Sequence, residues 1–196
     1  SEQNYWNCAA LTVWEYLSWN SGRKINSPEC MENLKDIRRK VFFDDELISV
    51  LKGKGVNSNW DLGYITVCIT WICCGKHNWE DFDGVLEYAK ALPDNIIDAY
   101  DDIALECSKR TGLDYGWLRR NELMWQTMMR IFQEWFLGDE LFYRNYGYYP
   151  VNAGKSGLLF KEEPIVDKEK LTEMLRLLNE TKRVCTGTGR PYIEMI

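Results

Sequence analysis

Hydrophobic residues recur three or four positions apart along most of this 196-residue chain, the spacing of one face of an α-helix. The pattern is strongest over 114–137, where the apolar side chains fall within an arc of about 160° at 100° per residue. A face that wide predicts a central helix that packs against several neighbours. The spacing, together with glycine and proline breakers, predicts about eight helices. They cover 6–19, 28–41, 45–51, 64–74, 79–92, 93–111, 114–137 and a last segment from 168.

Two of these helices have recognisable start signals. Ser27 can cap the second helix, and Pro28 suits its first helical position. Asp167 can cap the last helix, which carries an apolar stripe made of Leu171, Met174, Leu175 and Leu178.

The segment 64–74 is ambiguous. Its β-branched residues favour a strand, whereas the spacing of Ile65, Ile69 and Ile72 is helical. Asn59 before the segment and Gly75 after it favour a buried helix. Its eleven residues are too few to cross a bilayer, which takes about 20, so we expect no membrane association.

The stretch 143–160 has turn residues and several tyrosines but no helical period, and it predicts a long ordered loop. Loops of this length are often functional. The stretch 186–196 reads as a C-terminal tail that either docks through Tyr192 and Ile193 or stays loose. No repeat or linker requires a domain boundary. We therefore expect one compact, mainly α domain over residues 1–196.

Composition supports a large core and an intracellular location. The chain has 9 Trp, 11 Tyr and 7 Phe residues, and each buried aromatic side chain removes a large apolar area from water. Seven cysteines without a CxxC pair are typical of free thiols in a reducing compartment. The N-terminus shows no signal-peptide pattern. We expect a cytoplasmic protein.

Several common chemistries are excluded by residue count and spacing. His77 is the only histidine, so zinc sites that need two histidines are excluded, and we expect His77 to lie on the surface. The GKS at 154–156 lacks the first glycine of a phosphate loop, and the TGTG at 186–189 has no room for a following helix. No basic patch is interleaved with aromatic residues, so we expect no direct contact with nucleic acid.

The acidic residues are concentrated in one part of the chain. Between positions 76 and 106 there are nine acidic residues and two lysines, a net charge of −7. The remaining positions carry 21 acidic and 22 basic residues, a net charge of +1. The whole net charge of −6 therefore belongs to one predicted helical hairpin.

The second helix of that hairpin is amphipathic. Ile96, Ile97, Tyr100, Ile103, Ala104 and Cys107 form its apolar side, and the opposite side carries Asp94, Asp98, Asp101, Asp102, Leu105 and Glu106. Like charges four positions apart cost about 0.2–0.5 kcal/mol per pair. Leu105 lies among the carboxylates, where an apolar side chain is exposed unless something covers it. The acidic side predicts either an ordinary solvated face or a surface that binds a basic partner, with Leu105 as an apolar anchor.

A magnesium site is the alternative interpretation. Carboxylates three or four positions apart on adjacent antiparallel helices can hold Mg²⁺ and join it to substrate phosphates. Glu80, Asp83, Asp98, Asp101 and Asp102 would be the ligands. This arrangement distantly resembles the ExxE and ExxD helix pair of the MazG-like all-α nucleotide pyrophosphohydrolases, with aspartate at several glutamate positions. The resemblance implies a Mg²⁺-dependent nucleotide pyrophosphohydrolase.

The leading hypothesis is a non-catalytic module that binds a protein with a basic surface and has no cofactor. Its support is the segregated charge together with the lack of an assembled catalytic set. Inhibitors such as toxin-neutralising immunity proteins and phage-encoded antagonists share this combination of size, charge and aromatic content.

Overall fold

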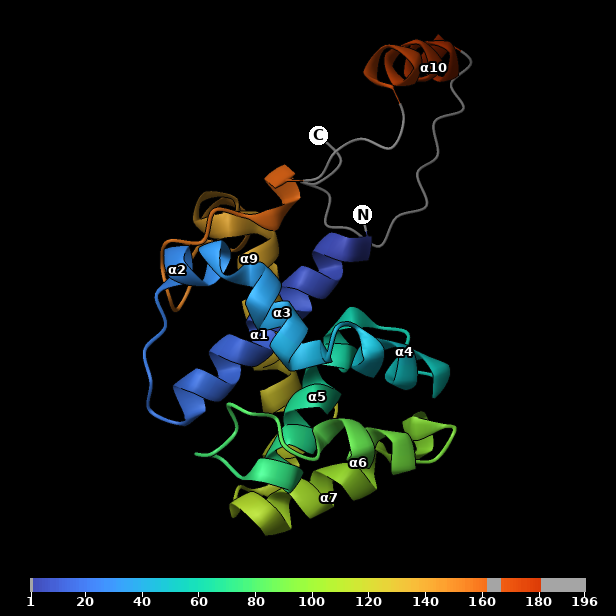
Figure 1. Ribbon diagram of the computed structural model, residues 1–196. Helices are drawn as coiled ribbons and strands as arrows, with labels where there is room; N and C mark the ends of the chain where they lie inside the picture. The colour runs from blue at the N-terminus through green and yellow to red at the C-terminus, as the bar shows by residue number, and fades with distance from the viewer. Residues whose placement is uncertain (1, 162–166, 181–196) are drawn as a thin grey trace.

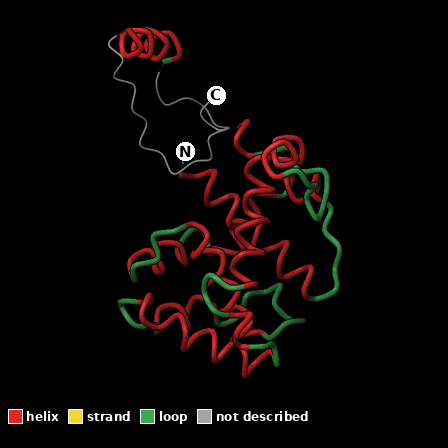
Figure 2. Tube along the Cα trace, turned by 180° about the vertical axis from the view of Figure 1, so that it is seen from behind, coloured by secondary structure: helices red, strands yellow, loops and turns green. Residues whose placement is uncertain are grey.

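The computed structural model describes residues 2–161 and 167–180, and Figures 1 and 2 show them as helices joined by loops, with no strand among them. The mainly α prediction is confirmed. In chain order the elements are α1 (Glu2–Asn20), α2 (Ser27–Glu32), α3 (Leu34–Phe42), α4 (Glu46–Gly53), α5 (Asn59–Cys74), α6 (Val85–Ala91), η1 (Ile96–Ala99), α7 (Tyr100–Thr111), α8 (Tyr115–Leu118), α9 (Leu123–Tyr146), η2 (Leu158–Lys161) and α10 (Lys168–Glu180).

The ambiguous segment 64–74 is helical and belongs to α5. Ser58 caps α5 by accepting hydrogen bonds from the backbone of Trp60 and Asp61, and Gly75 ends the helix with a φ of 75°. Every side chain from Asp61 to Trp71 is buried, because α5 packs against α1, α6, α7 and α9. Helix α5 therefore lies in the core together with α1 and α9, which pack against it and against each other.

The predicted helix over 114–137 is divided between α8 and α9. Asp114 caps α8 as a helix start should, but the chain turns at 119–122, where Asn121 has a φ of 68°. The turn brings Arg120 onto the buried carboxylate of Asp61, with two hydrogen bonds of 2.9 and 2.8 Å. A buried charge needs such a partner, and the sequence spacing does not reveal it. Trp117, one of the apolar residues in the predicted arc over 114–137, is 57% exposed and not in the core.

The two predicted helices over 79–92 and 93–111 are shorter than expected. Residues 79–84 form turns, and Phe82 is fully buried with a φ of 52°. The left-handed backbone aims the ring at Trp79, 5.8 Å away and edge to face. Helix α6 begins only at Val85, and η1 precedes α7 on the other side of Pro93.

Helix α9 bends at Gly138 and continues to Tyr146, so the predicted loop over 143–160 begins later, at Gly147, and gives way to η2 at Leu158. Gly138 has φ 77° and ψ 169°, a conformation available essentially only to glycine. A Cβ atom at Gly138 would lie 2.7 Å from the backbone nitrogen of Gly157. The bend therefore lets the end of the loop pack directly on α9.

Both predicted helix starts are present, but the cap of α2 lies one residue earlier than predicted. Asn26, not Ser27, caps α2 by accepting from the backbone of Glu29, which places Pro28 second in the helix. Asp167 caps α10, whose Met174 and Leu175 are exposed, and Figure 1 shows α10 standing apart from the other helices.

The tail over 186–196, with Tyr192 and Ile193, lies outside the described residues. In the described part of the chain, no helix has the length and apolar character needed to span a membrane.

Candidate functional site

The predicted acidic side is exposed along η1 and α7, at the opposite end of the molecule from α10 (Figure 1), except that Asp94 lies in the bend before η1 rather than on the helix. All six residues of this face are exposed: Asp94, Asp98, Asp101, Asp102, Leu105 and Glu106. We call them the α7 acidic face. The opposite side of α7 is buried against α5 through Tyr100, Ile103, Ala104 and Cys107, as the amphipathic pattern predicts.

The carboxylates of the α7 acidic face differ in how far they are neutralised. Asp101 accepts a hydrogen bond from Nε of Arg119 at 3.2 Å, and Asp94 lies 3.8 Å from Nζ of Lys54. Asp98 accepts from Asn95, and Glu106 from the Tyr88 hydroxyl. Asp102 has no hydrogen-bond or ion-pair partner among the described residues. The centre of the face therefore keeps most of its negative charge.

Two apolar side chains accompany this charge. Leu105 is 41% exposed, so no described segment covers it. Ile97 is 53% exposed, although it was predicted to lie on the apolar side of the helix. The reason for the error is that 96–99 is a 3₁₀ helix with three residues per turn, which rotates Ile97 outward while Ile96 stays buried. Exposed apolar side chains therefore lie among the carboxylates of the α7 acidic face.

The ligand set of the magnesium interpretation is not brought together. Glu80 and Asp83 lie in the turns of 79–84 rather than on a helix, and Glu80 pairs with Arg23 of the segment after α1. Within residues 2–161 and 167–180, no three Asp, Glu, His or Cys side chains are grouped closely enough to hold a metal ion. The antiparallel helix pair that the resemblance requires is therefore absent from the described structure.

The lysine of the GKS stretch, Lys155, forms buried ion pairs that hold the loop in place. Lys155 is buried, with Nζ 3.0 Å from Glu15 on α1 and 2.6 Å from Glu134 on α9. Arg130 also pairs with Glu134, at 3.0 Å, and Asn152 donates to Glu15. Burial raises the pKa of Glu15, while Lys155 partly opposes the shift. Two buried carboxylates are thus matched by two cations, which tie the loop to α1 and α9.

The outer side of this anchored loop carries tyrosines. The rings of Tyr143 and Tyr149 stack with centroids 4.3 Å apart, and Arg130 lies 4.6 Å from the ring of Tyr148. All three tyrosines are at least 42% exposed. These contacts join the loop to α9.

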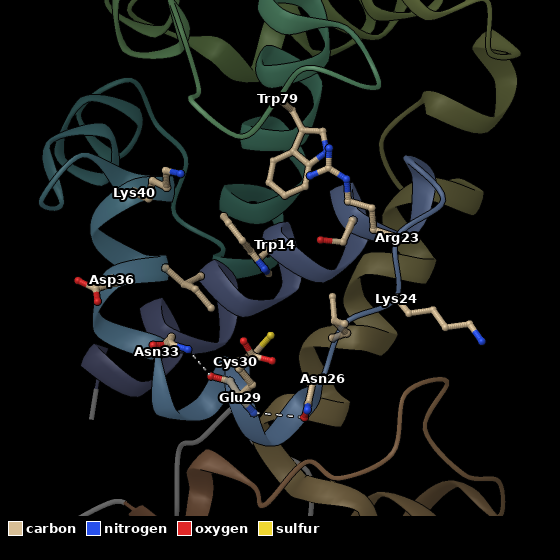
Figure 3. Close-up of a pocket in the computed structure, with 13 residues that line it drawn as sticks. Trp14, Arg23, Lys24, Asn26, Glu29, Cys30, Asn33, Asp36, Lys40 and Trp79 are labelled. Atoms are coloured by element: carbon tan, nitrogen blue, oxygen red, sulfur yellow. Dashed lines mark hydrogen bonds between the residues drawn. The ribbon is translucent and has the colours of Figure 1, made fainter.

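A pocket of about 460 Å³ lies between α1, α2, α3 and the segment 23–26 (Figure 3). Trp14 forms one wall, with Trp79 behind it at 5.0 Å and an interplanar angle of 84°. Figure 3 shows Glu29 below Trp14, held between Asn26 and Asn33, whose side chains bond to its backbone. Sequence reasoning missed this pocket, because its walls come from segments up to 65 positions apart.

The reactive groups of this pocket do not form a catalytic set. Burial, followed by the charges of Glu15 and Glu29, raises the pKa of Cys30 to about 11. A thiol with that pKa stays protonated at neutral pH and is a poor nucleophile. His77, the sole imidazole, is exposed in the turn after α5 and does not line the pocket. Its surface location agrees with the prediction.

Comparison with known proteins identifies the fold but no activity. No family model matches the chain, and no curated protein matches it. The chain is similar to the X-ray structure of Northeast Structural Genomics Consortium target ZR25, with a TM-score of 0.74 and 20% sequence identity. The match covers 99% of this chain and 61% of that chain, so this chain spans less than two thirds of its structural relative.

Proposed function

We propose that this protein is a non-catalytic binding module whose α7 acidic face captures a protein with a basic surface. The observation that carries the proposal is the exposed, largely unneutralised row of carboxylates with Leu105 uncovered in its midst. Clustered charge of one sign steers an oppositely charged partner and speeds association, while a central apolar side chain supplies contact energy.

The type of module that fits these features is an inhibitor that covers a basic active surface, such as an immunity protein against a toxin or a phage-encoded antagonist. A cytoplasmic location goes with this role. It is supported by the six described cysteines, all of them free thiols.

The alternative, a Mg²⁺-dependent nucleotide pyrophosphohydrolase, has no observation in its favour. Its five candidate ligands are divided between turns and a helix, and two of them are engaged by arginines. Addition of millimolar Mg²⁺ should leave the melting temperature unchanged. A clear rise that Asp98→Asn with Asp101→Asn abolishes would restore the enzyme hypothesis.

The binding proposal is tested by affinity capture from the native host with three baits. They are the wild-type chain, Asp98→Lys with Asp102→Lys, and Glu169→Lys with Glu173→Lys on α10. The last pair matches the first in charge change and in spacing, and both of its residues are exposed. We expect a protein that the wild-type and α10 baits retain and the α7 bait loses.

The kinetics of the captured complex then separate the roles of charge and contact. Charge reversal on α7 should slow association, most strongly at low salt, because the steering field is screened by ions. Leu105→Ala should instead speed dissociation. Equal recovery by all three baits, with circular dichroism showing each folded, would refute the proposal.

A further inference from the structure

The pocket of Figure 3 offers a flat aromatic wall to a ligand. Trp14 is half-buried, so part of its ring faces the pocket, and Trp79, which is 1% exposed, packs edge to face against it. Ile25 and Ile37 complete the apolar lining. A volume of about 460 Å³ lies within the range of ligand sites, roughly 300–1,000 Å³. An indole face of this kind stacks planar rings.

Hydrogen-bond donors without partners line the same space. Nε1 of Trp14, Oγ of Ser18 and Nδ2 of Asn26 donate to no acceptor among the described residues. Lys40 lies with Nζ 6.0 Å from the Trp14 ring centroid and pairs with no described carboxylate. Arg23 and Lys24 also line the pocket; Arg23 pairs with Glu80, and Lys24 pairs with no described carboxylate. Free donors beside basic side chains suit an anionic group, since charge-assisted hydrogen bonds are the strongest that such donors form.

Glu29 limits which anion fits. It is the lining carboxylate without a described cation partner, because Asp36 is paired with Arg39 at 3.1 Å. An anionic group placed beside Glu29 would be repelled by it. A ligand that presents N–H donors to Glu29 and negative charge to Lys40, with a planar body between them, would complement both side chains.

We propose that this pocket binds a guanine mononucleotide. The guanine edge carries a ring N–H next to an amino group, the pair of donors that a carboxylate accepts together, whereas adenine offers only its amino group. The ring stacks on Trp14, and the phosphate meets Lys40. The pocket shares no residue with the α7 acidic face, so this proposal does not depend on the proposed function.

Isothermal titration of the full chain with GMP, AMP and guanosine tests the proposal. We expect GMP to bind with a Kd below about 1 mM, and guanosine and AMP to bind about tenfold or more weakly, because each lacks one charge-assisted contact. Failure of GMP to bind, or equal binding of guanosine, would overturn it.

Two variants with matched controls assign the contacts. Glu29→Gln should weaken GMP about tenfold and remove the preference over AMP, whereas Glu32→Gln on the same helix should change neither. Lys40→Glu should abolish GMP binding and leave guanosine unaffected, whereas Lys35→Glu on the same helix should leave both unchanged. Neither control residue lines the pocket. If either variant behaves like its control while thermal melting shows it folded, the proposed orientation is wrong.

Discussion

The α7 acidic face and the ion cluster around Lys155 use charge in opposite ways. On α7 the carboxylates stay in water, so they keep their hydration and gain little from neighbours. At the loop, Glu15, Glu134 and Lys155 are all buried, and each has lost its hydration. Removing one partner there leaves an uncompensated charge in the interior. The exposed carboxylates of α7 are therefore available for binding, whereas the buried charges around Lys155 hold the fold together.

The comparison is tested most severely by Lys155→Met. The substitution leaves Glu15 and Glu134 buried with Arg130 as the remaining described cation, which pairs with Glu134 only. We expect the free energy of unfolding to fall by about 3–5 kcal/mol, the usual result of breaking a buried ion pair from one side. Denaturant titration followed by circular dichroism measures it.

The matched control is Asp102→Asn, which removes one charge from the α7 acidic face. Because Asp102 is exposed and has no described partner, its loss should change the free energy of unfolding by no more than about 0.5 kcal/mol. Similar losses for the two substitutions would show that the two regions do not differ as described.

Gly138→Ala tests how the loop reaches its ion cluster. The added methyl group would meet the Gly157 backbone, and the backbone conformation at Gly138 is itself unfavourable for alanine. We expect a loss of at least about 1–3 kcal/mol in thermal or chemical unfolding. Gly53→Ala at the end of α4 has open space around it and should be neutral or slightly stabilising. Equal effects would mean that the loop is not held by this close approach.

The smallest expected effect is a pH dependence that comes from Glu15. Because its pKa in the folded protein is raised above the ordinary 4.5, folding favours the protonated form. The stability that Glu15 contributes therefore falls as pH rises from about 4.5 through the folded pKa. The wild-type protein should gain stability relative to Glu15→Gln as pH is lowered from neutrality towards 4.5. A difference between the two proteins that is constant with pH would contradict the buried, desolvated state of Glu15.

Local patterns predicted the elements well where a helix has one partner. The amphipathic spacing of 100–111 identified both the buried and the exposed side of α7, and Gly75 and Asp167 marked helix ends correctly. The errors lie where distant contacts decide the backbone. Asp61 and Arg120 are 59 positions apart, and their ion pair accompanies the turn that divides α8 from α9. Phe82 leaves the helical region so that its ring can be buried against Trp79.

The two candidate sites differ in the same way: one depends on local spacing and the other on contacts between distant segments. The exposure of the α7 acidic face was predicted from the sequence, because the exposed side of a charged helix depends on local periodicity, although Asp94 lies before the helix. The pocket of Figure 3 was not predicted, because Trp14, Glu29, Lys40 and Trp79 converge only in three dimensions.

The sequence by itself determined that this chain is mainly helical, that its negative charge belongs to residues 76–106, and which side of α7 faces water. These properties follow from composition and from the period of the α-helix. Only the tertiary structure decided that α5 is buried along most of its length, that Lys155 is a buried structural cation, and that a donor-lined pocket lies beside Trp14. The physical reason is that burial and ion pairing depend on which distant segments meet, and no local pattern records those meetings.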